Sequence, residues 1–296
     1  MKTILVISVV SLSLFQRCSA SSSLIPSGIS DSCNSYLTAL NENTSLSSCT
    51  SALITASADY GPDADGLTSP SSSAVKSALD TLCSASTCSA GTLRTELTYF
   101  YSNCSDELTS SLNSDVLTLY DVVYGILPLK ETLCTQDDDG SYCALESSDA
   151  FSALTESVSS GSLSETLSRR ADSDITPDTE VISDSNLAFL FLTANLTEST
   201  LCTTCTRQVL TTWIQFESDT LYAPGISSSS MLSGQTALYN GVVETCGSSF
   251  LSGAVAAAGG LSQGSSSSGT VINASTSART AVVAAVLAGV FLLSIV

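Results

Sequence analysis

The first half of the chain contains segments in which apolar residues recur every three or four positions. This spacing places the apolar side chains on one face of a helix. Each of four such segments also carries a cysteine on that face: Cys33, Leu37 and Leu40; Leu46, Cys49 and Leu53; Val75, Leu79, Leu82 and Cys83; Leu93, Leu97, Phe100, Cys104 and Leu108. Because a buried cysteine packs as a small hydrophobe, we expect disulfides to join these helices through their apolar faces.

Further helices are expected after residue 110. One begins at Ser114 and Asp115, and Pro128 is expected to interrupt or restart it, because proline lacks the N–H that a helix interior uses. The apolar run 187–192 is expected to pack as an extended segment. The helical period then returns in three segments: Leu201, Cys205, Val209, Trp213 and Phe216; Leu232, Tyr239, Val242, Val243 and Cys246; Phe250, Ala254, Val255 and Ala258.

Two segments lack any such period. Residues 146–185 are acidic, rich in serine and almost free of aromatic residues, which predicts a disordered linker. Residues 262–273 are typical of a Ser/Gly-rich stalk. We therefore predict an all-α, disulfide-stapled helical bundle made of a Cys-rich part, 21–145, and a second helical part, 186–261, that packs on the first.

The first 20 residues indicate a cleaved secretory signal. Lys2 precedes an apolar run at 4–15, and small residues precede a cut after Ala20. Of eleven cysteines, Cys18 is lost with the signal, and an even number in a secreted chain predicts a disulfide framework. Its pairing cannot be derived from the spacing; its members are Cys33, Cys49, Cys83, Cys88, Cys104, Cys134, Cys143, Cys202, Cys205 and Cys246.

These cysteines are divided unevenly by the linker. Seven precede it and three follow it, so both counts are odd. If every cysteine is paired within one chain, at least one disulfide must cross between the two helical parts. The dibasic pair Arg169 and Arg170 lies in the linker and is a candidate site for a processing protease. A cut there would leave two chains joined by that disulfide.

The C-terminal residues 281–296 are uncharged and apolar, and the printed sequence ends within this run. Small residues and a short polar spacer precede it, which is typical of a glycosylphosphatidylinositol (GPI) attachment signal over 274–296. Asn273 is the expected attachment residue, and Gly269 or Ser268 would give a longer spacer. The alternative is a retained membrane helix, because the run is only slightly shorter than the roughly 20 residues that span a bilayer.

Charge and composition exclude several functions. The chain has 9 basic and 28 acidic residues, a net charge of −19, and such a surface repels nucleic acid and anionic lipid. Histidine is absent, which excludes Ser-His-Asp and Cys-His catalytic sets and His-ligated metal or haem sites. An enzyme would have to use carboxylates, tyrosine or lysine. No cofactor is predicted.

Several short motifs suggest modification or binding. Sequons begin at Asn43, Asn195 and Asn103, and the last is the poorest candidate because Cys104 within it is expected to be bridged and buried. Asn273 also begins a sequon, but we assign it to lipid attachment. Cys202 and Cys205 have the spacing of a redox dithiol, yet their helical context favours structural bridging.

One acidic stretch partly resembles a calcium-binding loop. Asp137 and Asp139 fall at positions 3 and 5, and Glu146 falls at position 12, but Thr135 stands where the first aspartate is expected. A disulfide between the flanking Cys134 and Cys143 would explain a rigid acidic turn equally well. Two carboxylate pairs, Asp106 with Glu107 and Glu217 with Asp219, could in principle perform glycosidase chemistry, although chance pairs are expected among so many acids.

Longer blocks resemble a domain of unknown function found in secreted, often GPI-anchored, Cys-rich proteins of fungi. They cover most of residues 31–260 and include "CNSYLTAL", "LTYFYSNCSDEL", "NSDVLTLYDVVYGILPLKETLC", "GSYC", "LCTTCTRQVLTTWIQFES" and "YAPGISSSSMLSGQTALYNGVVETCGSSFLSGAVAAAGG". The resemblance implies a fungal exterior and a helical fold, and it supplies no activity. The linker resembles this family least.

Together these features predict a GPI-anchored glycoprotein on the outer face of a fungal plasma membrane or cell wall, with a structural or interaction role. Its expected partners are the membrane, through the lipid, and wall glycan or surface proteins. The alternative is a carboxylate-based extracellular enzyme that acts on wall glycan. A deep pocket with two facing carboxylates near an aromatic residue would favour the enzyme.

Overall fold

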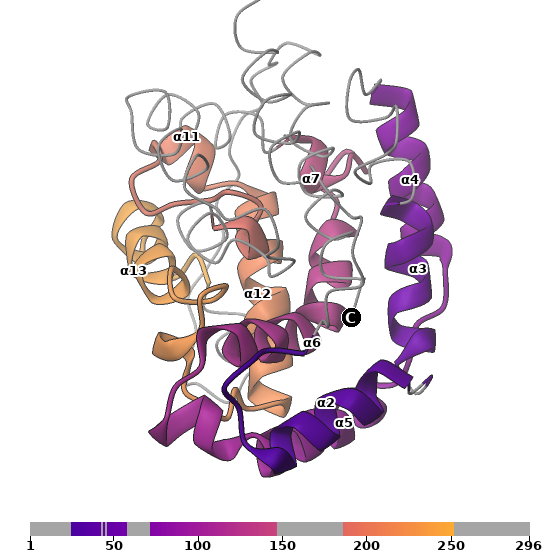
Figure 1. Cartoon of the computed structure of the whole chain (residues 1–296). Helices are drawn as coiled ribbons and strands as arrows, with labels where there is room; N and C mark the ends of the chain where they lie inside the picture. The colour runs from indigo at the N-terminus through magenta and orange to yellow at the C-terminus, as the bar shows by residue number, and fades with distance from the viewer. Residues whose placement is uncertain (1–24, 43, 45, 58–71, 147–185, 252–296) are drawn as a thin grey trace, which may run out of the picture.

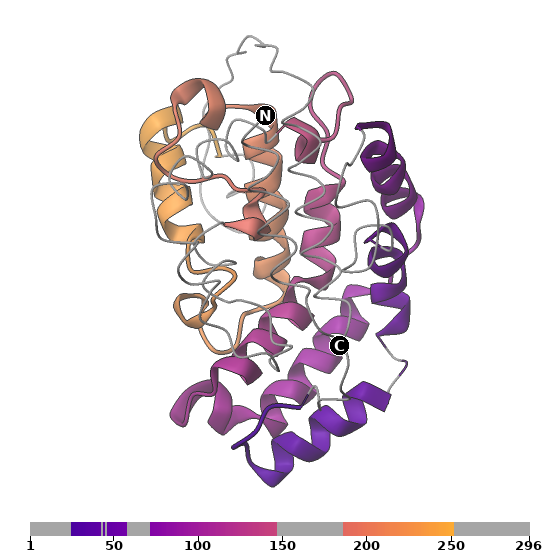
Figure 2. The same ribbon diagram turned by 45° about the horizontal axis from the view of Figure 1, so that its top comes forward.

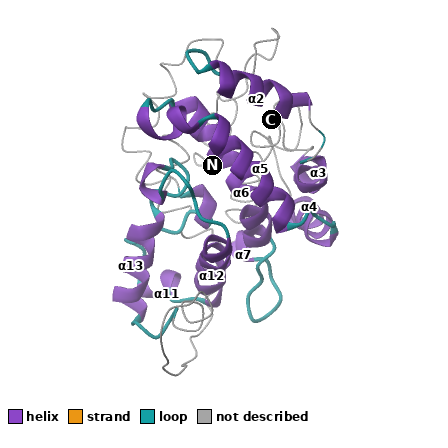
Figure 3. Cartoon of the chain, turned by 90° about the horizontal axis from the view of Figure 1, so that it is seen from below, coloured by secondary structure: helices purple, strands orange, loops and turns teal. Residues whose placement is uncertain are grey.

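The structure is a computed structural model that describes residues 25–42, 44, 46–57, 72–146 and 186–251. Within these ranges the chain is helical and no strand is present, apart from one isolated antiparallel bridge between Gln136 and Tyr142 (Figure 3). The all-α prediction is therefore confirmed. The predicted signal, linker, stalk and GPI signal, together with Asn43 and the Arg169–Arg170 pair, lie outside the described residues.

The first four described helices match the predicted helical periods. They are α2 (Asp31–Glu42), α3 (Ser47–Ser57), α4 (Ser72–Ser84) and α5 (Ala90–Asn103). Helix α2 lies against α5, and α3 lies against α4 (Figure 1). The predicted apolar faces point into the core, and Leu79 and Phe100 are fully buried. A short π-helix, η3 (Asp106–Ser110), then leads to the next long helix.

Helix α6 (Ser114–Leu133) is the centre of the fold. Every residue from 116 to 130 is buried, as expected for a helix surrounded by other elements on all sides. In Figure 2 this magenta helix lies between the indigo N-terminal helices and the orange C-terminal ones. Asn113 caps its start by accepting hydrogen bonds from the backbone N–H groups of Asp115 and Val116.

The predicted interruption at Pro128 is wrong, because α6 continues through it to Leu133. Proline removes one backbone hydrogen bond, and in a helix interior this costs about 3 kcal/mol. The side chains around Pro128, including Ile126, Leu127 and Leu129, are all buried. Their burial, at about 1.5–3 kcal/mol each, outweighs the loss of that bond.

The apolar run 187–192 is not extended. It forms a compact turn around the 3₁₀ helix η4 (Leu187–Phe189), and all six of its side chains are buried. Trp213 Nε1 donates to the Ala188 carbonyl at 3.0 Å, which ties the turn to the following helices. A short apolar run can be buried by a turn as well as by a strand, and here three residues adopt positive φ: Asn186, Leu190 and Phe191.

The C-terminal part adds four more helical elements: α11 (Glu198–Leu201), α12 (Thr204–Asp219), the 3₁₀ helix η5 (Ile226–Ser228) and α13 (Gln235–Cys246). Helix α12 packs on α6, and α13 packs on α11 (Figure 1). The single helix predicted from Leu201 to Phe216 is broken at residues 202–203, where Thr203 caps α12 by accepting from the Thr206 N–H. The last predicted helix begins as a turn at 248–251, and the rest of it lies outside the described residues.

Five disulfides use all ten of the predicted cysteines: Cys33–Cys104, Cys49–Cys88, Cys83–Cys134, Cys143–Cys205 and Cys202–Cys246. The crossing bond required by the odd counts is Cys143–Cys205, which joins the end of the N-terminal part to α12. The proposed closure of the acidic loop by Cys134 and Cys143 is wrong, because these residues pair elsewhere. The short helix α7 (Cys143–Glu146) carries one half of the crossing bond.

Candidate functional site: a cleft between α12 and α13

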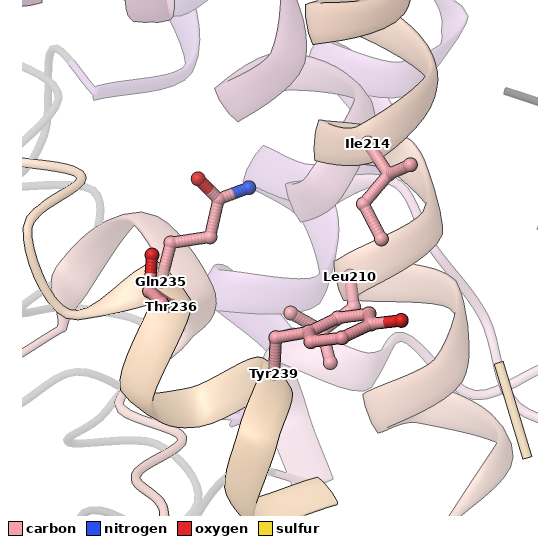
Figure 4. A pocket seen from close by; sticks show the side chains of 5 residues that line it. All are labelled: Leu210, Ile214, Gln235, Thr236 and Tyr239. Atoms are coloured by element: carbon pink, nitrogen blue, oxygen red, sulfur yellow. The ribbon is translucent and has the colours of Figure 1, made fainter. Parts of the chain in front are cut away.

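A cleft of about 300 Å³ separates two helices of the C-terminal part. Leu210 and Ile214 form its wall on α12, and Gln235, Thr236 and Tyr239 form its wall on α13 (Figure 4). Residues four apart share a face of a helix, so each wall is one face of its helix. The lining is mainly apolar.

The carboxyl group of Glu217 is connected to this cleft by a hydrogen bond from the lining residue Gln235. Glu217 follows Ile214 by one turn on α12, and its Oε2 accepts a hydrogen bond of 2.8 Å from Gln235 Nε2 on α13. Its other oxygen, Oε1, is buried and has no hydrogen-bond partner. Burial raises the pKa of Glu217 to about 7, although the hydrogen bond from Gln235 acts in the opposite direction. The carboxyl group is therefore neutral in acidic surroundings.

The structure does not bring either predicted carboxylate pair together as a catalytic pair. Asp219 is exposed, whereas Glu217 is partly buried. Asp106 is also exposed, where it accepts a hydrogen bond from the Ser110 hydroxyl. Glu107 is buried, and its Oε1 accepts from the Ser30 N–H at 2.6 Å. In each pair, the aspartate is therefore exposed to water and the glutamate is buried or partly buried.

The calcium-loop candidate is arranged as a backbone turn. Asp137 Oδ1 accepts hydrogen bonds from the N–H groups of Asp139 and Ser141, at 2.9 Å and 2.7 Å. Gly140 takes φ +80°, which closes the turn. The Asp139 side chain is exposed, and the side chain of Glu146 is outside the described residues. One oxygen of Asp137 is therefore directed at the backbone of its own loop.

Among the described residues, one group of three potential ligands has its ligand atoms close together: Cys33, Cys104 and Glu107. The two sulfurs of this group form a disulfide with each other, so they are not thiolate ligands. Cys202 and Cys205 do not pair with each other either, since each forms a disulfide with a distant cysteine. Their spacing is thus used for structural bridging, as their helical context indicated.

Two sequons can be placed. Asn195 is exposed in the loop that precedes α11, where its side chain is open to modification. Asn103 ends α5, and its amide donates to the Tyr99 carbonyl at 2.8 Å. The next residue, Cys104, is fully buried in its disulfide, as the sequence suggested.

A buried acid that we did not single out from the sequence joins α6 to the C-terminal part. Asp121 is 2% exposed, and its Oδ1 accepts from the Tyr222 hydroxyl at 2.5 Å. Its Oδ2 accepts from the N–H groups of Ser230 and Met231, at 2.9 Å and 3.3 Å. Burial raises the pKa of Asp121, and these hydrogen bonds oppose the rise. An aspartate inside the apolar run 116–129 was the available signal.

Comparison of the chain with protein-family models, with curated proteins and with solved structures finds no match. The resemblance to a fungal family therefore stays a prediction. Among the described residues, no helix combines the length and the apolar character needed to cross a membrane.

Proposed function

We propose that this chain is a GPI-anchored glycoprotein of a fungal-type cell surface or wall, with a structural or interaction role. The observation that carries the proposal is the set of five disulfides, which use all ten cysteines outside the predicted signal. Disulfides form and persist in oxidising compartments, so this framework is consistent with an extracellular protein. The anchoring is proposed from the composition of residues 262–296.

The chemistry of the surface is compatible with this role. The net charge of −19 favours solubility and disfavours contact with nucleic acid. Hydrolysis of wall glycan by paired carboxylates would require a second carboxyl group facing Glu217 across the cleft. The described lining supplies Tyr239, Gln235 and Thr236 instead. An interaction role is therefore the better supported of the two functions considered.

Phosphatidylinositol-specific phospholipase C tests the anchoring. We expect it to release the protein from membranes, because it cleaves the lipid of a GPI anchor. The mature protein should also lack the peptide 281–296 by mass spectrometry. Resistance to the enzyme, with peptide 281–296 still present, would indicate a retained membrane helix. A protein found only in the medium would contradict anchoring of either kind.

A further inference from the structure

We propose that release of the proton from Glu217 loosens the contact between α13 and α12, so that the cleft opens in neutral and alkaline surroundings and closes in acidic ones. The inference goes beyond the surface role proposed above and does not depend on the anchor. It rests on three features of the same place in the fold: the cleft, the single polar contact across it, and a buried carboxyl oxygen without a partner.

The contact across the cleft is narrow. Among the described residues, the Gln235–Glu217 hydrogen bond is the one side-chain bond between α12 and α13. The remaining facing side chains, such as Ile214 and Tyr239, are separated by the cleft itself (Figure 4). A weaker hydrogen bond at this place would therefore hold α13 less firmly against α12.

The two ends of α13 are held differently. At its C-terminal end, Cys246 is joined to Cys202 by a disulfide. At its N-terminal end, Gln235 is held toward α12 by the carboxyl of Glu217. Leu238 and Val242, in the middle of the helix, are fully buried. Because the disulfide fixes one end, we expect the N-terminal turn to be the part that moves.

The protonation state of Glu217 decides whether the closed arrangement is favourable. A neutral carboxyl group tolerates a buried oxygen such as Oε1 far better than a charged one does. The pKa of Glu217 is about 7 in the closed arrangement, above its usual 4.5. The closed arrangement therefore binds the proton more tightly, and its stabilisation is lost as the pH rises from about 4.5 through about 7.

The neighbours of Glu217 leave its charge uncompensated. From α6 it is faced by Tyr124, whose hydroxyl donates to the Thr220 carbonyl and whose pKa is raised by burial, so it stays neutral. From α13 it is faced by the neutral amide of Gln235. On its own helix the nearest acid is Asp219, which is exposed. In the described part of the chain no lysine or arginine forms an ion pair with Glu217.

Hydrogen exchange of the peptide 235–246 at pH 6 and pH 8 tests the proposal, after correction for the intrinsic pH dependence of exchange. If Glu217 reaches water in the open state, linkage raises the opening equilibrium by at most about tenfold between these two pH values. In the variant Glu217→Gln, which keeps the acceptor for Gln235 and cannot ionise, we expect no such rise. Glu244→Gln, on the exposed side of α13, removes the same charge and should retain the response.

Two exchange results would overturn the proposal. One is a corrected exchange rate in the wild-type protein that is the same at pH 6 and pH 8. The other is a pH response that persists in Glu217→Gln. If that variant does not fold, as judged by its helical circular dichroism, the wild-type protein still decides the question. A carbon NMR titration of the Glu217 carboxyl that gives an ordinary pKa would equally contradict it.

Discussion

Removal of the crossing disulfide Cys143–Cys205 should lower the free energy of unfolding by an amount that can be calculated from the loop it closes. The double variant Cys143→Ala/Cys205→Ala deletes the one covalent link between the N-terminal and C-terminal parts other than the chain itself. Alanine is chosen because Cys143 is 1% exposed, and a serine hydroxyl there would be buried. The variant therefore tests the bond rather than a new polar group.

The magnitude follows from the length of the closed loop. Cys143 and Cys205 are 62 residues apart. The one other cysteine inside that loop, Cys202, pairs with Cys246 outside it, so no shorter covalent path reduces the loop. For a loop of this length the chain-entropy relation gives about 4 kcal/mol of stabilisation. We expect the free energy of unfolding to fall by that amount.

Urea unfolding followed by tryptophan fluorescence is the assay. Trp213 is the one tryptophan of the chain, and it is fully buried. As a matched control, Cys202→Ala/Cys246→Ala opens a loop of 44 residues within the C-terminal part, and the same relation again gives about 4 kcal/mol. A loss below about 1 kcal/mol for the crossing pair, beside a full loss for the control, would refute the reasoning from loop length.

The same variant decides what happens if the chain is cut at Arg169–Arg170, which lies outside the described residues. The cut wild-type protein should run as one band on a gel without reductant and as two bands with it, because Cys143–Cys205 holds the two pieces together. The cut double variant should give two bands under both conditions. Two bands from the cut wild type without reductant would show that the crossing bond is not formed.

Two further predictions concern buried contacts. A Cβ at Gly241 would lie 2.8 Å from the Ala194 Cα, so Gly241→Ala should lower the free energy of unfolding by about 1–3 kcal/mol. As a control, a Cβ at Gly91 on α5 would lie 3.5 Å from Ser89 Oγ, an ordinary contact distance, so Gly91→Ala should raise the free energy of unfolding by up to about 1 kcal/mol. Equal effects of the two variants in urea titrations would contradict the close approach at Gly241. Tyr222→Phe removes the hydroxyl that donates to Asp121 and should cost about 1.5–3 kcal/mol at pH 7, and an unchanged unfolding midpoint would show that this bond does not hold the loop to α6.

The helices of the first half were predictable because each buries only one face. Leu93, Leu97 and Phe100 recur at helical spacing, and the structure buries all three on α5. The run 187–192 was not predictable in the same way. Six consecutive apolar residues carry no period, so the sequence could not distinguish an extended segment from the turn that Trp213 and Asn186 stabilise by hydrogen bonds.

The cysteine counts predicted that a disulfide crosses between the two helical parts, but they did not predict which cysteines form the pairs. The odd number of cysteines on each side of the linker required a bond between the two parts, and Cys143–Cys205 provides it. Which cysteines pair depends on how helices far apart in sequence lie together. Cys134 could have closed the short acidic loop, but it faces α4, where it meets Cys83.

The candidate cleft could not be predicted from the sequence, because it also depends on contacts between residues far apart in the chain. Glu217 was noted only as a member of a carboxylate pair with Asp219, because spacing along one helix was the available information. Its unusual pKa comes from burial, and its hydrogen-bond partner Gln235 lies 18 residues further along the chain. Neither feature leaves a periodic trace in the sequence.

Amphipathic spacing is least informative for helix α6, because every residue from 116 to 130 is buried and the helix has no polar face. A helix buried on every side must also bury its polar residues, and a buried charged group without a hydrogen-bond partner is costly. Asp121 finds its donors at Tyr222 and in the following loop. Lys130 donates to the Ala85 carbonyl at 2.6 Å, and burial lowers its pKa. Asp121 and Lys130 thus specify which segments pack around α6, whereas its apolar residues specify only that it is buried.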